Sequence, residues 1–524
     1  MVSNSNQYSE CSKIGNWSGV IKLERKFHAE KDMQYLSRAE ISQTYHQGEE
    51  AVIALVETLQ NALKRMEILE GRIAMLEGQT KKNSGNSSKP PSSDGLRRTV
   101  SERTASGKKP GGQAEHPGRT LERSASPDEI IRHSVASVCP QCSTSLSDVA
   151  AEVVESRQVM DVPKVSVHVT EHQVEAKTCP CCQARHKASF PVHVVSPVQY
   201  GQRVSALAVY LNVYHLVPRE RTVEILEELC GIALSNGTLE NMLERAFDAT
   251  EEAEEHIKEA IIHSQAIHAD ETGARIAGKT QWIHTASTEQ WTHYHPSFHR
   301  GKDAHAETGI LEQFAQSAAQ SGGVLHSDFY ASYHGYICHH AYCNAHLLRN
   351  LRFLADVRKH PWATQMRELL RETLHALHQH QHASNNPHAR LDEQTIRSIE
   401  TRYDELVEAA LRLHPRSTER ENGTTKGRIK QSEERLLAER LLHHKADILR
   451  FATDPYAVFD NNLAERDLRM IKVQQKISGS FRSMNGAMVF CRLRGFCSTL
   501  RKQAINILDA LFDVFSNKNV QFQF

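Results

Sequence analysis

Two short stretches, QAIHADETG (residues 265–273) and GGVLHSDFY (residues 322–330), decide the fold class of this 524-residue chain. Each contains a brief apolar run bounded by turn or polar residues, a pattern that predicts a buried strand. The first run ends at Asp270 and the second at Asp328. If the two strands are neighbours, their carboxyl ends bring the two carboxylates side by side.

The segments around these strands predict a mixed α/β core. TQWIHTAST (280–288) and QWTHYH (290–295) alternate in polarity and are expected to form a meander with the first strand. DAHAETGILEQFAQ (303–316) predicts an amphipathic helix, and HAYCNAH (340–346) is a candidate fifth strand. The expected order of three strands, helix, strand, helix, strand is that of a ribonuclease-H-like fold.

The two aspartates predict a divalent-metal site, because adjacent carboxylates repel each other unless a cation neutralises them. Oxygen-only ligands suit Mg²⁺ or Mn²⁺, and Mg²⁺ keeps coordinated waters beside a substrate phosphate. Two such ions about 3.5–4 Å apart can activate an attacking oxygen and stabilise a leaving one. A third acid is needed, and a helix packed on the sheet can supply it.

The stretch DNNLAERDLRMIKVQQK (residues 460–476) offers three candidates for the third acid. Asp460 suits the N-cap position of a helix. Asp467 lies two residues after Glu465, and on a helix this spacing turns it roughly 200° away. Glu465 is therefore the expected third ligand. For this stretch alone, the alternative is an exposed helix with i,i+4 salt bridges.

The same helix is expected to contact DNA. Arg469 and Lys472 follow Glu465 on one face at i+4 and i+7, so one stripe offers a metal ligand and then cations for phosphate groups. The residues expected to bind DNA are Arg466, Arg469, Lys472 and Lys476.

Paired cysteines predict a structural zinc site. Cys139-Pro-Gln-Cys142 and Cys179-Pro-Cys-Cys182 are two C-x-x-C turns, and four thiolates on two such turns match tetrahedral Zn²⁺. The segment KVSVHVTEHQVEA (164–176) alternates in polarity and is expected to form a ribbon hairpin. Cys181 competes with Cys182 for the fourth position.

Upstream of the cysteines, the chain is expected to hold a coiled coil and a basic linker. Apolar residues recur in alternating steps of three and four, a heptad seam that joins protomers; the alternative is an amphipathic helix packed on its own domain. The seam consists of Val52, Leu55, Leu59, Ala62, Met66, Leu69, Ile73 and Leu76. Residues 81–123 carry ten Lys or Arg against four Asp or Glu, a local charge of +6, in a composition typical of disorder. The first 32 residues show no period, and Met33 is a candidate true start.

Residues 201–247 are expected to be helical. Within them, VEILEELCGIALSNGTLENMLERA (223–246) has the layout of a helix-turn-helix, with a turn at Gly231 and a second helix capped near Ser235. A plain helical hairpin is the alternative, since the second helix is not notably basic.

The bulk composition points to no polyanionic partner, because 63 Lys and Arg balance 63 Asp and Glu. The sequence has no apolar run of about 18 residues and no apolar signal region at its start, so the protein is expected to be cytoplasmic with no membrane partner. Eleven cysteines in so long a chain do not make a disulfide scaffold.

Several blocks resemble transposases of the insertion sequence 66 family, which have an Asp–Asp–Glu catalytic core. These blocks are HADETG, HSDFYASY, CNAHLLRNL and DNNLAERDLR, together with NSSKPPSSD in the linker and the paired C-P-x-C turns. The resemblance covers about residues 33–510. It implies that Asp270, Asp328 and Glu465 are the catalytic triad, with a helical insertion between the last two. It also implies a supporting role for His346 and Arg349.

We therefore predict an α/β multidomain protein with a ribonuclease-H-like catalytic core and a helical insertion, preceded by a coiled coil, a zinc ribbon and a helix-turn-helix. The expected divisions are an N-terminal extension (1–48), the coiled coil (49–78), a disordered basic linker (79–128), the zinc-binding ribbon (129–198), a helix-turn-helix-like DNA-binding region (199–260), the first part of the core (261–355), the helical insertion (356–455), the second part of the core with the Glu465 helix (456–510) and a C-terminal tail (511–524).

The resemblance implies a bacterial, nucleoid-associated DNA transposase. Such an enzyme binds the ends of its own insertion sequence, cleaves the 3′ strands by metal-assisted hydrolysis and joins them to target DNA by transesterification. Expected partners are the terminal inverted repeats, target DNA, further copies of the chain through the coiled coil, and accessory proteins encoded by the same element. Two alternatives stay open: a ribonuclease-H-like nuclease or resolvase that cuts without joining, and a catalytically inactive DNA-binding regulator.

Overall fold

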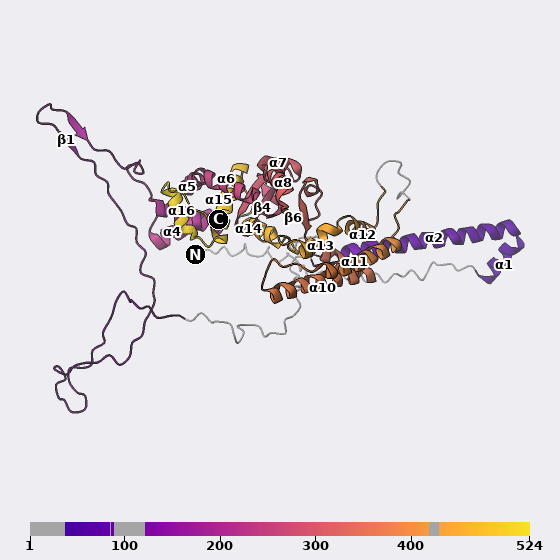
Figure 1. Ribbon diagram of the computed structural model, residues 1–524, viewed down its shortest axis with the longest axis horizontal. Coiled ribbons are helices and arrows are strands. Elements are labelled where there is room, and N and C mark those ends of the chain that lie inside the picture. The colour runs from indigo at the N-terminus through magenta and orange to yellow at the C-terminus, as the bar shows by residue number, and fades with distance from the viewer. Residues whose placement is uncertain (1–36, 84, 88–120, 419–428, 524) are drawn as a thin grey trace, which may run out of the picture. The chain divides into compact units, whose positions relative to one another are not determined.

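The computed structural model describes residues 37–83, 85–87, 121–418 and 429–523 (Figure 1). The chain divides into two compact units, Met1–Lys81 and Lys82–Phe524, and each is described by itself. The candidate start at Met33 and most of the basic linker (79–128) lie outside the described residues.

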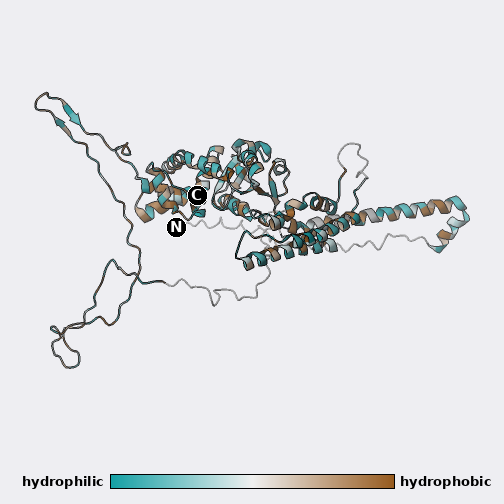
Figure 2. Cartoon of the chain, in the orientation of Figure 1, coloured by the Kyte–Doolittle hydropathy of each residue, from teal (hydrophilic) through white to brown (hydrophobic). Residues whose placement is uncertain are grey.

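The described part of the first unit contains helices α1 (Arg38–His46) and α2 (Glu49–Thr80). The seam predicted for residues 49–78 therefore lies on one continuous helix. Segments coloured as hydrophobic recur along the ribbon of α2 (Figure 2), and Leu59 and Leu69 of the seam are 51% and 56% exposed. The apolar seam is open to solvent in this single chain.

The second unit is built on a five-stranded mixed sheet in the order β5–β4–β3–β6–β7. The strands are β3 (Ala266–Ile276), β4 (Lys279–Ser287), β5 (Thr292–Ser297), β6 (Val324–Ser327) and β7 (His339–Tyr342). The first three form an antiparallel meander, whereas β6 and β7 run parallel to β3. The predicted α/β class and its five strands are confirmed.

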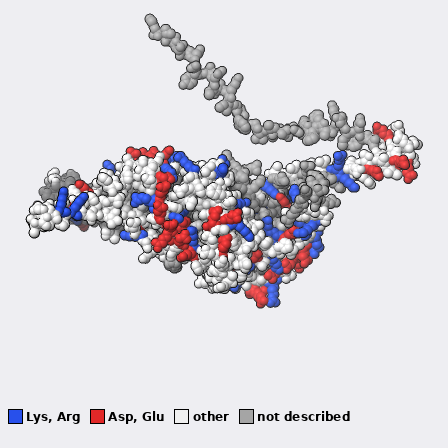
Figure 3. Space-filling model, turned by 90° about the horizontal axis from the view of Figure 1, so that it is seen from above, with Lys and Arg blue, Asp and Glu red and all other residues white. Residues whose placement is uncertain are grey.

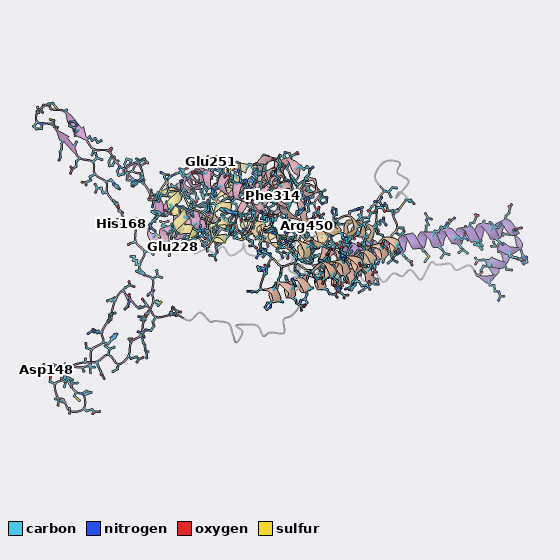
Figure 4. All side chains as sticks on the ribbon, in the orientation of Figure 1. Asp148, His168, Glu228, Glu251, Phe314 and Arg450 are labelled. Carbon is cyan, nitrogen blue, oxygen red and sulfur yellow. The ribbon has the colours of Figure 1, made fainter. Side chains whose placement is uncertain are left out.

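Helices cover both faces of this sheet. They are α6 (Glu251–Ile262), α7 (Lys302–Thr308), α8 (Ile310–Ser321), α14 (Asn462–Ser478) and α15 (Met484–Lys502). On one face, α6 and α8 pack against Ile267 and Leu325, and Phe314 of α8 (Figure 4) is buried there. On the other face, α14 and α15 pack against Ala274. Since successive strand residues point to opposite faces, Asp270 shares the α14 face with Ala274.

Three local features differ from the predicted pattern. β3 does not end at Asp270, because its antiparallel pairing with β4 continues to Ile276. The single helix predicted at 303–316 is divided into α7 and α8, because Gly309 adopts a left-handed conformation with φ of 66°. Between β6 and β7, the chain forms a single 3₁₀ turn, Tyr333–Gly335, where a helix was predicted.

The predicted helical insertion (356–455) folds around a core of its own. Its helices are α10 (Pro361–Ser384), α11 (Glu393–Leu413), α12 (Glu433–His443) and α13 (Lys445–Thr453), and α9 (Asn344–Arg352) with a π-helical turn (Phe353–Val357) leads into it. Arg450 of α13 (Figure 4) donates a 2.7 Å hydrogen bond to the carbonyl oxygen of His340. The insertion is thus attached to the β7 edge of the sheet.

The helices expected to bind DNA pack together with the C-terminal helices. The helices expected to bind DNA are α3 (Gln202–Val209), a π-helical turn (Tyr210–Tyr214), α4 (Arg219–Cys230) and α5 (Asn236–Ala249). The C-terminal helix that packs against them is α16 (Ile507–Phe515). Two helices joined by a short turn are present here: Gly231 ends α4 with φ of 68°, and the Ser235 side chain caps α5. Leu239 and Leu511 belong to one core that reaches the sheet. The boundary expected after residue 510 falls inside α16, whose Leu511 is fully buried.

The zinc-binding region contains two short antiparallel strands, β1 (Ala176–Thr178) and β2 (Arg185–Lys187). The ribbon predicted from residue 164 is not formed: residues 164–175 contain no strand, and Val165 and Val169 are exposed. Figure 4 labels His168 in this segment. Alternating polarity alone does not make a strand, because its backbone groups need a hydrogen-bonded partner. The hairpin forms instead around the second cysteine turn.

Candidate active site

Asp270 and Asp328 occupy matching positions on neighbouring parallel strands. β3 and β6 pair with an offset of 58 residues, as in Ile267 with Leu325. Continued by two residues beyond the last pair, this offset sets Asp270 opposite Asp328, which directly follows β6. Neighbouring strands lie about 4.8 Å apart, so this register is expected to bring the two side chains close together, and the charge of Asp328 is among the causes that raise the pKa of Asp270.

The candidate carboxyl groups influence one another. Burial, then the charges of Glu271 and Asp328, raise the pKa of Asp270 well above its ordinary range, and Glu465 adds to this shift. Burial also raises the pKa of Asp328 and that of Glu465. Keeping several such groups ionised in one buried place is costly, and a bound cation reduces this cost.

Glu465 is the acid of α14 that reaches this face. It lies in the first turn of the helix, which packs against β3. Asp467 points elsewhere, because its carboxylate accepts from Lys502 Nζ at 2.8 Å in the core. Asp460 precedes the helix and accepts from the backbone N–H of Asn462 at 3.0 Å. The cap position itself belongs to Asn461, one residue later than predicted.

Two residues of α9 lie beside Glu465. Its Oε1 is 3.6 Å from His346 Nδ1 and 3.8 Å from Arg349 Nη2. Burial lowers the pKa of His346 to about 3, so its ring is neutral near pH 7. The two residues predicted to support the active centre are therefore brought next to the candidate third acid.

Glu465 also belongs to a second group of possible metal ligands. Within the described chain, Cys343, His346 and Glu465 have ligand atoms within 4.8 Å of one another, whereas Asp270, Asp328 and Glu465 do not form such a group. Burial raises the pKa of the Cys343 thiol to about 12. Because metal binding needs the thiolate, this sulfur is a poor ligand as it stands.

Asn461 is a residue that the sequence pattern did not single out for the site. Its side-chain Nδ2 donates to the carbonyl oxygen of Ala269 at 2.9 Å, so its Oδ1 accepts from Nδ1 of His268 at 2.8 Å. Its backbone N–H donates to Cys343 Sγ at 3.2 Å. Asn461 therefore fastens the start of α14 to β3 beside Asp270. The feature of the sequence that could have drawn attention to Asn461 is its position four residues before Glu465.

Glu271 is turned to the opposite face from Asp270, as strand alternation predicts. Its carboxylate accepts from Tyr333 at 2.6 Å and from Arg300 Nε at 2.9 Å. These partners occupy the carboxylate of Glu271 and make it a structural neighbour of the candidate ligands.

The predicted DNA-binding residues differ in their surroundings. Arg466, Arg469 and Lys476 are exposed on α14, whereas the Lys472 ammonium group donates to the carbonyl oxygen of Gly273. On the face shown in Figure 3, acidic and basic side chains gather in separate small patches, in keeping with the balanced net charge. The exposed face of α5 includes Glu244 and Asp248, which favours the helical hairpin over a groove-reading helix.

The two cysteine turns have the same backbone geometry. The N–H of Cys139 donates to Thr144 O and that of Cys179 donates to Ala184 O, each at 2.9 Å. All four predicted ligands are free thiols on turns that present two sulfurs each, a donor set that fits Zn²⁺. The four sulfur atoms do not form one group within 4.8 Å in the described chain.

Comparison with family models gives the class of protein and then the family. Residues 197–489, more than half of the chain, match the model described as Transposase IS66 family, and residues 136–183 match the zinc-finger binding domain of transposase IS66. The core is therefore that of a transposase, a DNA-processing enzyme. In particular, the chain belongs to the IS66 family of transposases.

Further comparisons concern the remaining parts. Residues 41–122 match a family of unknown function (DUF6444). The zinc-finger match spans Cys139, Cys142, Cys179 and Cys182 and supports a structural zinc ion there. A search of curated proteins finds no match. Of the helices described, none is both long enough and apolar enough to span a membrane.

Proposed function

We propose that this transposase cuts and joins DNA with Asp270, Asp328 and Glu465 as its catalytic carboxylates. One juxtaposition supports the proposal: Asp270 lies on β3, Asp328 directly follows the paired strand β6, and Glu465 lies in the first turn of the helix that packs against β3, with the charges of Asp328 and Glu465 both acting on Asp270. We also propose that the core is ribonuclease-H-like, because an antiparallel β5–β4–β3 meander followed by parallel β6 and β7 matches the strand arrangement expected of that fold.

The donor set fits Mg²⁺ or Mn²⁺, since carboxylate oxygens are hard ligands and the raised pKa of each carboxyl marks a place where positive charge relieves repulsion. When bound, such ions supply the charge that activates an attacking oxygen and stabilises a leaving one. The chain itself holds the carboxylates on rigid elements, and His346 and Arg349 orient Glu465.

Two displacements at phosphorus account for cutting and joining. In the first, a water oxygen attacks at the end of the element and the bond to the 3′ oxygen breaks, leaving a 3′-hydroxyl on the element and a 5′-phosphate on the flank. In the second, this hydroxyl attacks a target phosphorus and displaces a target 3′-hydroxyl. One phosphodiester forms as another breaks, so no covalent intermediate with the protein is needed.

The other segments have proposed roles in assembly and binding. The α2 seam pairs copies of the chain, the zinc ribbon stabilises the N-terminal region, and the exposed residues Arg466, Arg469 and Lys476 contact the DNA backbone. Accessory proteins encoded by the same element are the expected further partners.

Glu465→Gln tests the proposal. With purified protein, labelled DNA from both flanks of the gene and Mg²⁺ or Mn²⁺, we expect the variant to lose end cleavage and joining by at least 100-fold, the order of loss when a transition-state interaction is removed. Asp509→Asn is the matched control, because Asp509 is also an acid in the first turn of a helix but is exposed on α16.

Each outcome separates the alternatives. Metal-dependent cutting and joining that disappear only in Glu465→Gln support the transposase. Cutting that ignores the element ends and never joins identifies a nuclease or resolvase. Specific binding without any cutting identifies a regulator. Equal activity in wild type and Glu465→Gln removes Glu465 from the site and redirects attention to Asp460.

A further inference from the structure

The two residues after Asp328 are aromatic, and each ring carries an arginine. The guanidinium carbon of Arg440 lies 4.8 Å from the centroid of the Phe329 ring, and that of Arg300 lies 4.2 Å from the centroid of Tyr330. The backbone N–H of Tyr330 donates to Asp328 Oδ1 at 2.8 Å, which ties this short segment to the candidate carboxylate. Two cations from distant parts of the chain thus flank Asp328.

The guanidinium group of Arg300 is held by several contacts but remains partly exposed to solvent. It comes from the loop between β5 and α7, and its guanidinium also lies 4.6 Å from the centroid of Trp282. Nε and Nη2 both contact Glu271 Oε1 at 2.9 Å. The side chain is nonetheless 42% exposed. A planar guanidinium held between two rings has lost its rotational freedom before any ligand arrives, and its remaining N–H groups are free to bind.

Arg440 reaches the same place from helix α12 of the insertion. Among the described residues, the guanidinium group of Arg440 has no hydrogen bond and no ion pair, and the ring of Phe329 is its neighbour. Burial lowers the pKa of Arg440, and the charge of Asp328 opposes that shift. A partly buried cation without an anionic partner is costly unless a ligand supplies the negative charge.

Neither arginine forms an ion pair with Asp328 among the described residues, although both lie near enough to lower its pKa. The charges of two guanidinium groups from different parts of the chain therefore act on the carboxylate of Asp328. Guanidinium groups are well matched to phosphate oxygens, which accept two parallel N–H bonds.

We propose that Arg300 and Arg440 form a phosphate clamp, which grips a phosphodiester of the DNA strand that enters the carboxylate site. The insertion then takes part directly in substrate binding, because it places Arg440 beside Phe329 and Asp328. The ligand class, a DNA phosphate, rests on the proposed function.

Binding without chemistry tests the clamp. Full-length protein is titrated into fluorescein-labelled duplex from the gene flanks, with Ca²⁺ in place of the catalytic metal, over a series of salt concentrations. Arg440→Ala and the double change Glu271→Gln with Arg300→Gln are compared with wild type. The double change removes both charges of the Arg300–Glu271 ion pair, so that the buried Glu271 carboxylate is not left without its cation. Arg402→Ala is the control, because Arg402 pairs with Glu372 on the exposed side of the insertion at 2.6 Å.

We expect each clamp variant to bind about 10-fold more weakly and to lose about 0.9 from the slope of log K against log salt for each phosphate contact removed. Single phosphates of the duplex are also replaced, one at a time, by uncharged methylphosphonate linkages. Some of these replacements will weaken binding of the wild-type protein. At one or more of the same positions, the replacement should no longer weaken binding of a clamp variant. Urea unfolding at neutral pH checks that every variant is folded.

The inference is overturned if folded clamp variants bind DNA with the affinity, salt dependence and methylphosphonate pattern of wild type. It is also overturned if Arg402→Ala loses as much DNA affinity as the clamp variants do. Neither result depends on cutting. If wild type fails to cleave DNA but the clamp variants still lose phosphate contacts, the proposed function fails and the clamp stands.

Discussion

At the level of single residues, Asn461 attaches the start of α14, and with it Glu465, to strand β3. Asn461 is 2% exposed and joins residues of β3, α14 and the start of α9 through three hydrogen bonds. The His268 ring in this cluster stacks on His326, with centroids 4.2 Å apart. His326 accepts from the N–H of Val458 at 2.9 Å and is therefore neutral. This neutral polar cluster positions the acid without adding charge beside it.

Asn461→Ala is expected to destabilise the core by about 1–3 kcal/mol, because it leaves the Ala269 carbonyl and the His268 N–H buried without partners. DNA cleavage should fall more steeply than stability, since the start of α14 loses its attachment to β3. Urea unfolding and the end-cleavage assay measure the two effects. Asn462→Ala, one residue on and exposed, should change neither; equal effects at both positions would contradict the role of Asn461.

Among the elements, α2 and the cysteine turns each have a proposed role that the sheet does not provide. A 32-residue helix with an exposed apolar stripe gains stability mainly by burying that stripe. None of residues 121–200 is buried, so the cysteine region is expected to depend on a bound zinc ion for a fixed structure. Both elements are expected to be ordered by a partner: a second helix in one case and an ion in the other.

Leu69→Lys is expected to shift the protein from oligomer to monomer, because it places a charge in the middle of the exposed seam. Analytical ultracentrifugation over a range of concentrations measures the change. Glu70→Lys alters charge next to the seam and should leave the assembly in place. A wild-type protein that is already monomeric at high concentration would contradict the coiled coil.

Loss of one zinc thiolate is expected to release the metal. Wild type should hold one zinc per chain by atomic emission after desalting, and Cys179→Ser should hold almost none. Cys181→Ser tests the rival fourth ligand: it should retain zinc, and Cys182→Ser should lose it. The reverse pattern would assign the fourth position to Cys181.

At the scale of the whole molecule, the fold combines a sheet core and a helical core that meet along β7 and α9. The C-terminal helices return to pack against α3 and α5, so distant segments share one hydrophobic interior. Beside this interior the fold also holds several partly buried acids, whose mutual repulsion opposes folding. Such a conflict between stability and a polar site is common where function needs the charges.

Asp270→Asn is therefore expected to be more stable than wild type at pH 8 without metal, by about 1–2 kcal/mol. The sign follows from the raised pKa: the folded state disfavours the ionised carboxyl, so the wild-type group destabilises the fold above its folded pKa. As pH falls through that value, wild type takes up the proton and the difference should shrink. His268, whose pKa burial lowers to about 4, affects both proteins alike and cancels. Urea unfolding from pH 8 to pH 5 measures the difference; a gain that grows toward acid would contradict this account.

Local periodicity in the sequence was sufficient for much of the fold. Alternation predicts the meander and turns Glu271 away from Asp270, and the 3.6-residue period separates Glu465 from Asp467. Heptad and C-x-x-C spacing likewise predict the α2 seam and the paired cysteine turns. Each of these patterns is set by residues a few positions apart, so each can be recognised along the chain.

Other features depend on contacts across the chain. The 58-residue offset that aligns Asp270 with Asp328 is set by the pairing of β3 with β6, and His268 meets Asn461 across 193 residues. Arg300, from the loop between β5 and α7, and Arg440, from the insertion, both come to lie near Asp328. Register and long-range contacts arise when separate elements pack and exchange hydrogen bonds, and local patterns do not encode these distances. For this reason only the tertiary structure brings the carboxylates and their neighbours into one site.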